Sequence, residues 1–581
     1  MSSEDRITVV VVGPKFACLP GEPPRGPTMI SPVLLTLLLP APAHACGGFF
    51  CNTTPVDQSG EDIVFSVDED KGEVTVHVQI AYQGAAEEFA WIVPVPQAPE
   101  LVLSTDRLFQ ELAWRTQPRF NLEYKEIFRC EGGIGGYGAS SDAAFSASSP
   151  APPSASGGGV TVVSEQQVGP YDTVTLQADT SEALLGWLQD NDYLLPDSLD
   201  PVLAPYVADG SFFVALKLSK DSDVGELAPL GMRYPGDLAS VPIQLTSIAA
   251  TEDMRLRAYV IGDSRAVPES YLHVQINDLV VDWFSGGSNW EDAITIAADE
   301  AGGQAFATDY SGSTDVMEEA LYRPGMYDVE ALASSPDAYA FFDEIVRQGF
   351  PGDSTMMSLF QEFLPMPPAL AAEGVSEQDF YNCLSCYTPW VDAIPFDAAA
   401  FADAIDERIV SPLRLAQRLF DDHSHLTRLT SSVSPIEMTK DPTFVFNRDM
   451  EQTVELERKA SLEFYCGFGG TWSDSERRLV LADGRSYRLP SQQWFWDHGL
   501  TEYEYLSKLM DVYALIIEET GPDGEPVVLF DGSEDAWAAA GAFNGGSAGA
   551  GCGCTSTSTS TASGVAGALA LFGLLLRRRR A

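Results

Sequence analysis

The chain has 581 residues, of which 84 are acidic and 34 are basic, so its formal net charge is −50 at neutral pH. Such an acidic surface repels the phosphates of nucleic acids and of anionic lipids, which argues against nucleic acid as a partner. The hydrophobic fraction of 45% excludes a disordered acidic polymer and allows a large core. At this length we expect two or more subdomains.

The N-terminal region has the pattern of an export signal. Residues 1–28 are rich in Pro and Gly and show no regular period, and we interpret them as a mis-assigned start. Residues 29–45 are typical of a signal peptide, with a short apolar stretch that ends in Ala43-x-Ala45. Signal peptidase would cut after Ala45 and leave Cys46 first. Lipidation of Cys46 is the alternative, and it would leave one cysteine of the body unpaired.

The first part of the body, residues 46–130, is predicted to be rich in β-strands. Alternating apolar residues favour strands at Glu61–Val67, Glu73–Tyr82 and Phe89–Val93, the last ended by Pro94 and Pro96. A helix is predicted at Asp106–Arg115. Residues 131–159 consist mainly of Gly, Ser, Ala and Pro, and we expect a low-complexity insertion or linker.

The pattern changes twice after this insertion. Residues 160–284 continue the β-rich part, with a helix capped by Thr180 and strands predicted at the following ranges: Val160–Gln167, Asp172–Gln177, Phe212–Leu218, Pro242–Ile248, Met254–Ile261 and Leu279–Trp283. Residues 285–425 are predicted to be helical, at Trp290–Glu300, Pro336–Arg347, Ser354–Phe363 and Ala398–His423.

Residues 426–537 return to β-structure. Strands are predicted at His425–Ser431, Phe444–Phe446 and Gln452–Glu457, followed by a hairpin at Arg478–Leu489 that turns at Asp483-Gly484. The predicted fold class is α+β, with β-rich N-terminal and C-terminal parts around a helical middle. The C-terminal part can close back on the first sheet, and disulfides are expected to staple the body.

The disulfide prediction rests on six cysteines in the body, an even number in an exported chain: Cys46, Cys51, Cys130, Cys383, Cys386 and Cys466. Fifteen pairings of six cysteines are possible. Pairing near neighbours gives Cys46–Cys51 and Cys383–Cys386, which leaves Cys130–Cys466 as a bridge between the two ends of the body.

The C-terminal tail has the pattern of a sorting signal. Residues 538–563 form a Gly/Ser/Thr-rich linker with Cys552 and Cys554, residues 564–576 are apolar, and residues 577–581 carry the arginines Arg577, Arg578, Arg579 and Arg580. Basic residues remain on the cytoplasmic side of a membrane, so the body would lie outside. The tail resembles the myxobacterial sorting signals recognised by a rhomboid-like or intramembrane sortase, called myxosortase. This resemblance implies cleavage near Cys552 or Cys554, whereas a simple membrane anchor would keep the apolar segment.

The body carries a second resemblance, on seven short segments: 46–51 (CGGFFC), 91–96 (WIVPVP), 168–173 (VGPYDT), 213–217 (FVALK), 232–235 (MRYP), 426–429 (LTRL) and 438–442 (MTKDP). These segments resemble the bacterial family called domain of unknown function 2330, over about residues 46–450. The resemblance implies an exported protein, and it supplies no catalytic residues.

Several residue patterns are candidates for chemistry, each with a structural alternative. Cys383-x-x-Cys386 has the spacing of a redox pair, but a structural disulfide is favoured over a redox pair or over a zinc site shared with Cys46 and Cys51. His423 and His425 are either metal ligands or a solvated helix end. Two acidic clusters resemble calcium loops but more often form turns or helix ends: Asp68, Asp70 and Gly72, and Asp190, Asp192, Asp197 and Asp200. Trp494, Trp496 and His498 line either a carbohydrate-binding surface or the core.

The sequence therefore predicts an exported, disulfide-stapled protein of the cell envelope, displayed at the cell surface with a structural or binding role. Its predicted partners are signal peptidase, a C-terminal sorting protease and, through the tail, the membrane. Its physiological partner is not identified. No metal site or cofactor is assigned, apart from a weak calcium signal that suits a mature charge of about −54, from 81 acids and 27 bases. The alternative is an exported hydrolase or thiol-redox enzyme, and a deep pocket with clustered carboxylates of shifted pKa would favour the hydrolase.

Overall fold

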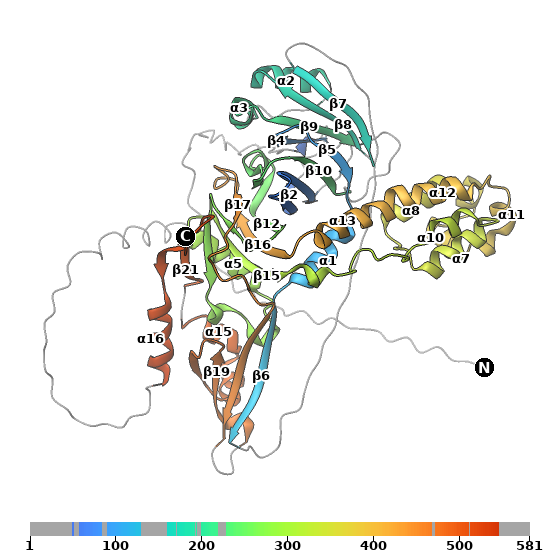
Figure 1. Cartoon of the computed structure of the whole chain (residues 1–581). Helices are drawn as coiled ribbons and strands as arrows, with labels where there is room; N and C mark the ends of the chain where they lie inside the picture. Colours follow the sequence, from blue (N-terminus) through green and yellow to red (C-terminus); the bar gives the residue numbers. More distant parts are fainter. Residues whose placement is uncertain are drawn as a thin grey trace, which may run out of the picture. The chain divides into compact units, whose positions relative to one another are not determined.

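The computed structural model describes residues 49–50, 57–83, 90–128, 160–169, 171–191, 193, 199–218, 228–466, 471–509 and 512–544 (Figure 1). In this part of the chain the strands form four sheets, and helices and strands are mixed. The α+β class predicted from the sequence is confirmed.

The largest sheet, called the central sheet below, has ten strands drawn from distant parts of the chain. In spatial order they are β22 (Val527–Asp531), β21 (Ala514–Glu519), β14 (Leu272–Ile276), β15 (Ala305–Ser313), β16 (His425–Val433), β12 (Ala250–Gly262), β2 (Asp57–Asp68), β3 (Glu73–Gln83), β10 (Leu230–Pro235) and β5 (Glu100–Leu103). Most neighbours are antiparallel, but β12 pairs in parallel with β2 and β14 with β15. The C-terminal part thus closes back on the first sheet, as the sequence pattern allows.

A five-stranded sheet faces the central sheet. Its order is β1 (Phe49–Phe50), β4 (Ala90–Val95), β9 (Phe212–Leu218), β8 (Tyr171–Ala178) and β7 (Val160–Val168). Pro94 lies inside β4, whereas we expected it to end the strand. The strand continues through Pro94 because residues 90–95 pair with β9, where Pro94 lies opposite Phe213.

Two smaller sheets complete the β-structure. The three-stranded sheet has the order β11 (Ala239–Ser240), β17 (Thr443–Phe446) and β13 (Ala266–Pro268). The four-stranded sheet has the order β20 (Ser486–Leu489), β19 (Glu476–Leu481), β18 (Glu457–Tyr465) and β6 (Arg119–Phe128). Gly484 turns the predicted β19–β20 hairpin with a φ of 89°, a conformation that favours glycine.

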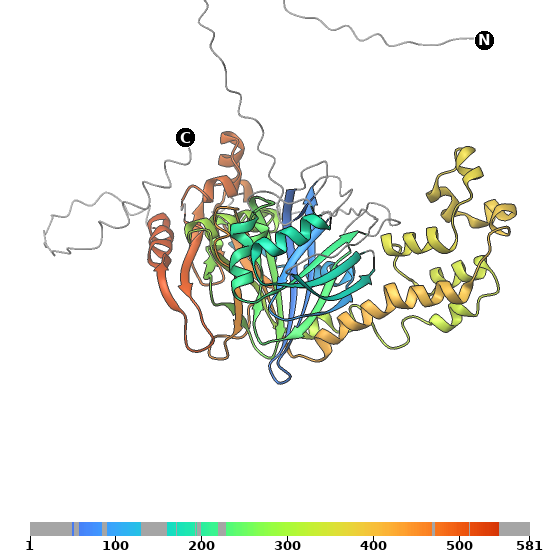
Figure 2. The ribbon, with the colours of Figure 1, turned by 90° about the horizontal axis from the view of Figure 1, so that it is seen from above.

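The helices are mostly short. They are α1 (Asp106–Thr116), α2 (Ser181–Asp190), α3 (Asp200–Ala208), α4 (Ile243–Thr246), α5 (Trp290–Glu300), α6 (Val329–Ala333), α7 (Ala338–Gln348), α8 (Ser354–Phe363), α9 (Pro368–Ala372), α10 (Glu377–Asn382), α11 (Thr388–Val391), α12 (Ala398–Ile405), α13 (Ser411–Asp421), α14 (Gln492–His498), α15 (Glu502–Leu506) and α16 (Ser533–Asn544). A π-helical turn, Asp406–Val410, joins α12 to α13, so the predicted helix Ala398–His423 is nearly continuous. The helices α6 to α13 gather together in Figure 2, in yellow to orange.

Four apolar clusters arrange these elements in layers. One cluster fills the space between the two large sheets, with Phe65 and Val260 from the central sheet and Val93 and Leu216 from the five-stranded sheet. The outer face of the five-stranded sheet packs against α2 and α3, which Figure 1 shows beside β7, β8 and β9. A second cluster joins the other face of the central sheet to α1 and the helices α6 to α13, and a third joins α5 to the four-stranded sheet.

Four further local predictions are wrong. Residues Leu279–Trp283 form two 3₁₀ turns, because Asn277 and Asp282 accept hydrogen bonds from backbone N–H groups two or three residues ahead. Pro242–Ile248 holds the short helix α4. Gln452–Glu457 contributes only an isolated bridge between Val454 and Ser311 before β18 begins. The region predicted as helical also contains strand β15, which lies between β14 and β16 in the central sheet.

Candidate functional site

A cavity of about 480 Å³ lies between the central sheet and the five-stranded sheet. This size suits a small organic molecule. Its walls are mainly apolar: β2, β3 and β10 contribute one side and residues 91–95 of β4 the other, while α3, α4 and Asp441 contribute polar groups. Pro96, Gln97, Asp209 and Leu238 also line it and are exposed, so the cavity opens to solvent.

Strand β2 explains why an acid enters this cavity. Glu61, Ile63 and Phe65 alternate along one face of β2, and all three line the cavity, whereas Val64 packs in the cluster on the opposite face. Glu61 therefore occupies a position on the apolar face of β2, where an apolar residue is expected. A register shift between Gln58 and Gly60 marks a bulge just before it, which brings Gln58 to the same side.

Glu61 is buried, and the described residues that line the cavity include no basic side chain. It is only 4% exposed, and its Oε2 accepts a hydrogen bond of 3.1 Å from the Gln58 amide. Burial raises the pKa of Glu61 from 4.5 to about 7, and the nearby charges of Asp62 and Asp441 add to this, while hydrogen bonds from Gln58 and Thr246 oppose it. The carboxyl group is thus poised to gain or lose a proton near neutral pH.

Asp441 is the second acid of the cavity. Its Oδ1 accepts hydrogen bonds from the backbone N–H of Gln244 and from the hydroxyl of Tyr206, both at 3.0 Å. Burial raises the pKa of Asp441, against these hydrogen bonds. The adjacent Lys440 does not neutralise it, because the Lys440 ammonium donates to the carbonyl of Ser270 and lies over the ring of Tyr271.

The short helix α4 connects the two acids. Thr246 hydrogen-bonds Glu61, and Gln244 donates its backbone N–H to Asp441. Ile243 belongs to the cluster between the sheets and Leu245 to the cluster under α2 and α3, so α4 is anchored on both sides. The result is a polar end built from Gln58, Glu61, Tyr206, Gln244, Thr246 and Asp441, within an otherwise apolar cavity.

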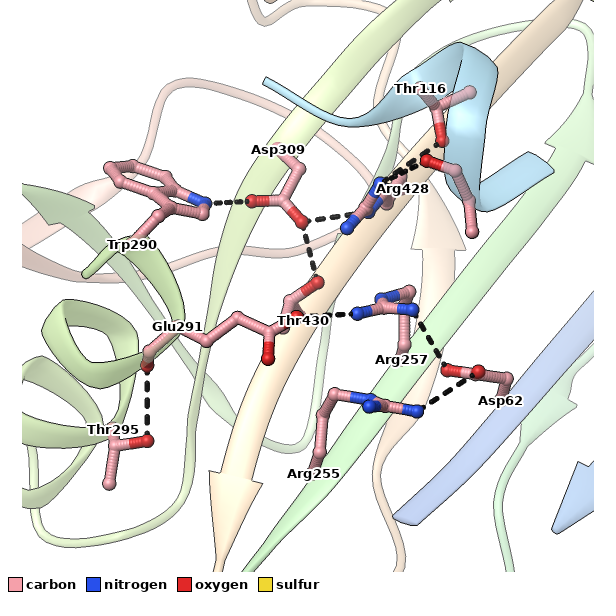
Figure 3. A network of polar contacts seen from close by, with 11 residues as sticks. Asp62, Thr116, Arg255, Arg257, Trp290, Glu291, Thr295, Asp309, Arg428 and Thr430 are labelled. Carbon is pink, nitrogen blue, oxygen red and sulfur yellow. Dashed lines mark hydrogen bonds and ion pairs between the residues drawn. The ribbon is translucent and has the colours of Figure 1, made fainter. Parts of the chain in front are cut away.

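The opposite face of the central sheet carries a different arrangement of charges (Figure 3). Asp309 is fully buried and forms an ion pair of 2.8 Å with the Nε of Arg428. The Trp290 indole and the Thr430 hydroxyl also donate to Asp309, at 2.8 and 2.6 Å. This face does not line the cavity, and we interpret the network as structural.

The same network continues along β12 and β2. Asp62 pairs with both Arg255 and Arg257, at 3.2 and 3.4 Å, and Arg257 reaches Glu291 on α5 at 2.8 Å. Three arginines therefore balance three acids across four neighbouring strands and one helix.

A third buried cluster joins an acid, an imidazole and a hydroxyl. His273 lies between Glu518, at 2.7 Å from its Nδ1, and Thr308, at 2.9 Å from its Nε2. This order is that of a catalytic triad. All three residues are buried and none of them lines the cavity, so a substrate has no described route to the hydroxyl.

The predicted cysteine sites fall into two groups. Cys383 and Cys386 form a disulfide, at the end of α10 and away from the cavity lining. Cys466 is also disulfide-bonded, and its partner lies outside the described residues. The partner predicted for Cys466 from the sequence, Cys130, lies outside the described residues. The remaining processing, anchoring and disulfide candidates also lie outside the described residues: Ala45, Cys46, Cys51, Cys130, Cys552, Cys554 and Arg577–Arg580.

The histidine candidates are engaged within the fold. His425 Nε2 hydrogen-bonds Ser311 at 2.9 Å, and His423 lies 3.7 Å from Asp263. Among the residues that the structure describes, no group of three or more His, Cys, Asp or Glu side chains is placed to hold a metal ion.

The acidic turn and the aromatic candidates are also placed. Asp68 accepts from the backbone and the ammonium of Lys71, so its cluster forms the β2–β3 hairpin turn. Phe495 is buried and Trp494 stacks on His498, while Trp496 remains exposed beside Trp472. No helix within the described ranges has the length and apolar character required to cross a membrane.

The cavity acids were not predicted from the sequence, because Glu61 and Asp441 lie far apart in the chain. One signal was present in the sequence: in an alternating strand, Glu61 lies on the same face as the apolar residues Ile63 and Phe65. Three of the segments that carry the family resemblance, 91–96, 232–235 and 438–442, contribute residues to the cavity lining.

The fold and the site define an α+β protein with a ligand-sized cavity between two sheets. A sequence model described as "Uncharacterized protein conserved in bacteria (DUF2330)" matches residues 40–332, and the chain belongs to this family. The match includes both sheet walls of the cavity and Glu61, while Asp441 lies beyond it. Searches of curated proteins and of solved structures gave no match.

Proposed function

We propose that this protein is an exported component of the cell envelope, displayed at the surface, that binds a small molecule in the cavity between its two sheets. The cavity carries the proposal, since it combines about 480 Å³, apolar walls and two acids of raised pKa at one polar end. A mainly apolar pocket with a few convergent polar groups is the usual form of a small-molecule site.

The delivery of the protein is the second part of the proposal. The segment 29–45 serves as the signal peptide, and the tail 551–580 serves as the sorting signal that is cut near Cys552 or Cys554. Disulfides at Cys383–Cys386 and at Cys466 support an oxidising compartment, because such bonds persist outside the cytosol.

An acid–base hydrolase is the second candidate function. One observation favours it: Glu61, with a pKa of about 7, shares the cavity with a second carboxyl group, and general acids often have a pKa raised in this way. The redox alternative has less support, because Cys383 ends helix α10 instead of beginning a long helix that would lower its thiol pKa.

The binding proposal is tested by recovering the ligand. The full-length protein is isolated from its native envelope and denatured, and the released small molecules are identified by mass spectrometry. The matched variant Val76→Phe adds bulk to a buried residue of the cavity wall, and Val346→Phe makes the same change at an exposed site. We expect a compound with wild type and Val346→Phe that is lost with Val76→Phe. Equal recovery from all three proteins would overturn the cavity as the binding site.

The same preparation separates binding from hydrolysis. The recovered compound and close analogues are incubated with fresh protein and with Glu61→Gln. Unchanged compound supports a binding protein. Turnover that Glu61→Gln abolishes, while binding persists, supports the hydrolase. Intact mass of the native protein tests delivery, and a mass that retains Arg577–Arg580 would overturn the processed tail.

A further inference from the structure

The charged residues that line the cavity are all acidic. Three acids line it, Glu61, Asp209 and Asp441, and among the described lining residues there is no Lys, Arg or His. The described groups that act on the pKa of Glu61 are Gln58, Thr246 of α4, Asp441 and, from the opposite face of β2, Asp62, and none of these is basic. The polar donors that reach the two inner acids are amide, hydroxyl and backbone groups.

Two other largely buried acids of the described chain are paired with arginines: Asp309 with Arg428, and Asp62 with Arg255 and Arg257. Burial of a carboxylate without such a partner is unfavourable, because no ion pair offsets the free energy lost with its hydration. Among the described residues Glu61 and Asp441 have no such arginine, and both line the open space of the cavity.

The remainder of the cavity defines the rest of the ligand. Ile63, Phe65 and Val76 from one sheet and Trp91 and Val93 from the other give apolar and aromatic walls. These walls suit an alkyl or aryl body, and aromatic side chains also attract ammonium groups.

We infer that the molecule bound in the cavity is an organic ammonium ion, with its positively charged nitrogen at Glu61 and Asp441 and an apolar body between the sheets. This inference rests on the proposed function, since it names the ligand class of the same site. Each acid keeps its present hydrogen bonds, and the ammonium supplies the charge that these neutral donors lack. A neutral sugar or alcohol would fill the space without neutralising the carboxylates.

Calorimetry with two matched probes tests this inference on the full chain. 4-Phenylbutylamine is charged, and 4-phenylbutan-1-ol has nearly the same shape without the charge. We expect the amine to bind about tenfold more tightly at about pH 8, since direct charge pairing in a desolvated site contributes at least this much. The preference is expected to fall at about pH 6, where Glu61 retains its proton.

Two variants separate the inference from the binding proposal. Glu61→Gln and Asp441→Asn are each expected to reduce the preference for the amine over the alcohol, with circular dichroism confirming the fold. Equal binding of both probes to the wild type would overturn the ammonium ligand and leave the cavity as a binding site. If neither probe binds, or if Val76→Phe binds both as well as the wild type does, the cavity proposal itself fails.

Discussion

The two faces of the central sheet differ in how their buried acids are neutralised. On the face covered by α1 and α5, Asp309 and Arg428 form a pair without open space around it. On the face toward the five-stranded sheet, Glu61 and Asp441 lie against a cavity with neutral hydrogen-bond donors alone. On the first face the protein's own arginine neutralises the buried acid. On the second face the buried acids have no such partner, and a bound ligand can supply the positive charge.

The largest expected effect comes from breaking the paired face. Asp309→Asn leaves the Arg428 guanidinium buried without a counter-charge, and we expect the free energy of unfolding to fall by about 3–5 kcal/mol. Urea unfolding measures this loss. The double variant Asp309→Asn/Arg428→Met removes both charges, and it should lose less than the sum of the two single changes. A loss below about 1 kcal/mol in Asp309→Asn would contradict a structural role for the pair.

Glu61 is expected to show the opposite behaviour. Because its pKa rises from 4.5 in the unfolded chain to about 7 in the fold, the folded state holds the proton more tightly. Stability is therefore lost as pH rises through this window, by about 3 kcal/mol in total. Glu61→Gln removes the loss, so the free energy of unfolding of the variant relative to wild type should increase from pH 4.5 upward and level off above about pH 7.

The control for Glu61 is Asp209→Asn, at the exposed rim of the same cavity. A difference between Glu61→Gln and wild type that stays constant with pH would show that Glu61 is solvated in solution.

His77 sharpens the comparison because it lies on the other face of the sheet, opposite Val64 in the register of β2 and β3. Burial lowers the pKa of His77 to about 4 from 6.5. The unfolded chain binds the proton more tightly, so stability is lost as pH falls from 6.5 toward 4, again by about 3 kcal/mol. His77→Gln should abolish this acid-side loss in urea unfolding at several pH values. The window runs in the opposite sense to that of Glu61, and equal slopes for the two variants would be inconsistent with their assigned environments.

The fold was partly predictable because many of its signals are local. The strand predicted at Phe212–Leu218 matches β9, and the helix predicted from Thr180 matches α2, whose first turn Thr180 caps through the N–H of Ala183. The short helix α4 was predicted as a strand because its anchor, Asp441, is remote in sequence and bonds Gln244 only after folding.

The candidate site was less predictable for the same reason. Glu61 lies in β2 and Asp441 lies just before β17, and neither local sequence indicates that the two residues meet in the fold. Alternation in β2 does mark Glu61 as an acid on an apolar face. The absence of a cation beside it is a property of the assembled cavity, and no local pattern records it.

The smallest expected effect comes from an ion pair with geometry as good as that of Asp309 and Arg428. Arg408 Nη1 lies 2.6 Å from Glu362 Oε2, but their side chains are 37% and 48% exposed. We expect Arg408→Ala to change the free energy of unfolding by less than about 0.5 kcal/mol, since water and salt screen the charges. Urea unfolding at low and high salt measures it beside Asp309→Asn. Because the two pairs are similarly close, a large difference in cost assigns the effect to burial. Burial also makes the ionised form of Glu61 and Asp441 costly, and a bound cation would lower this cost.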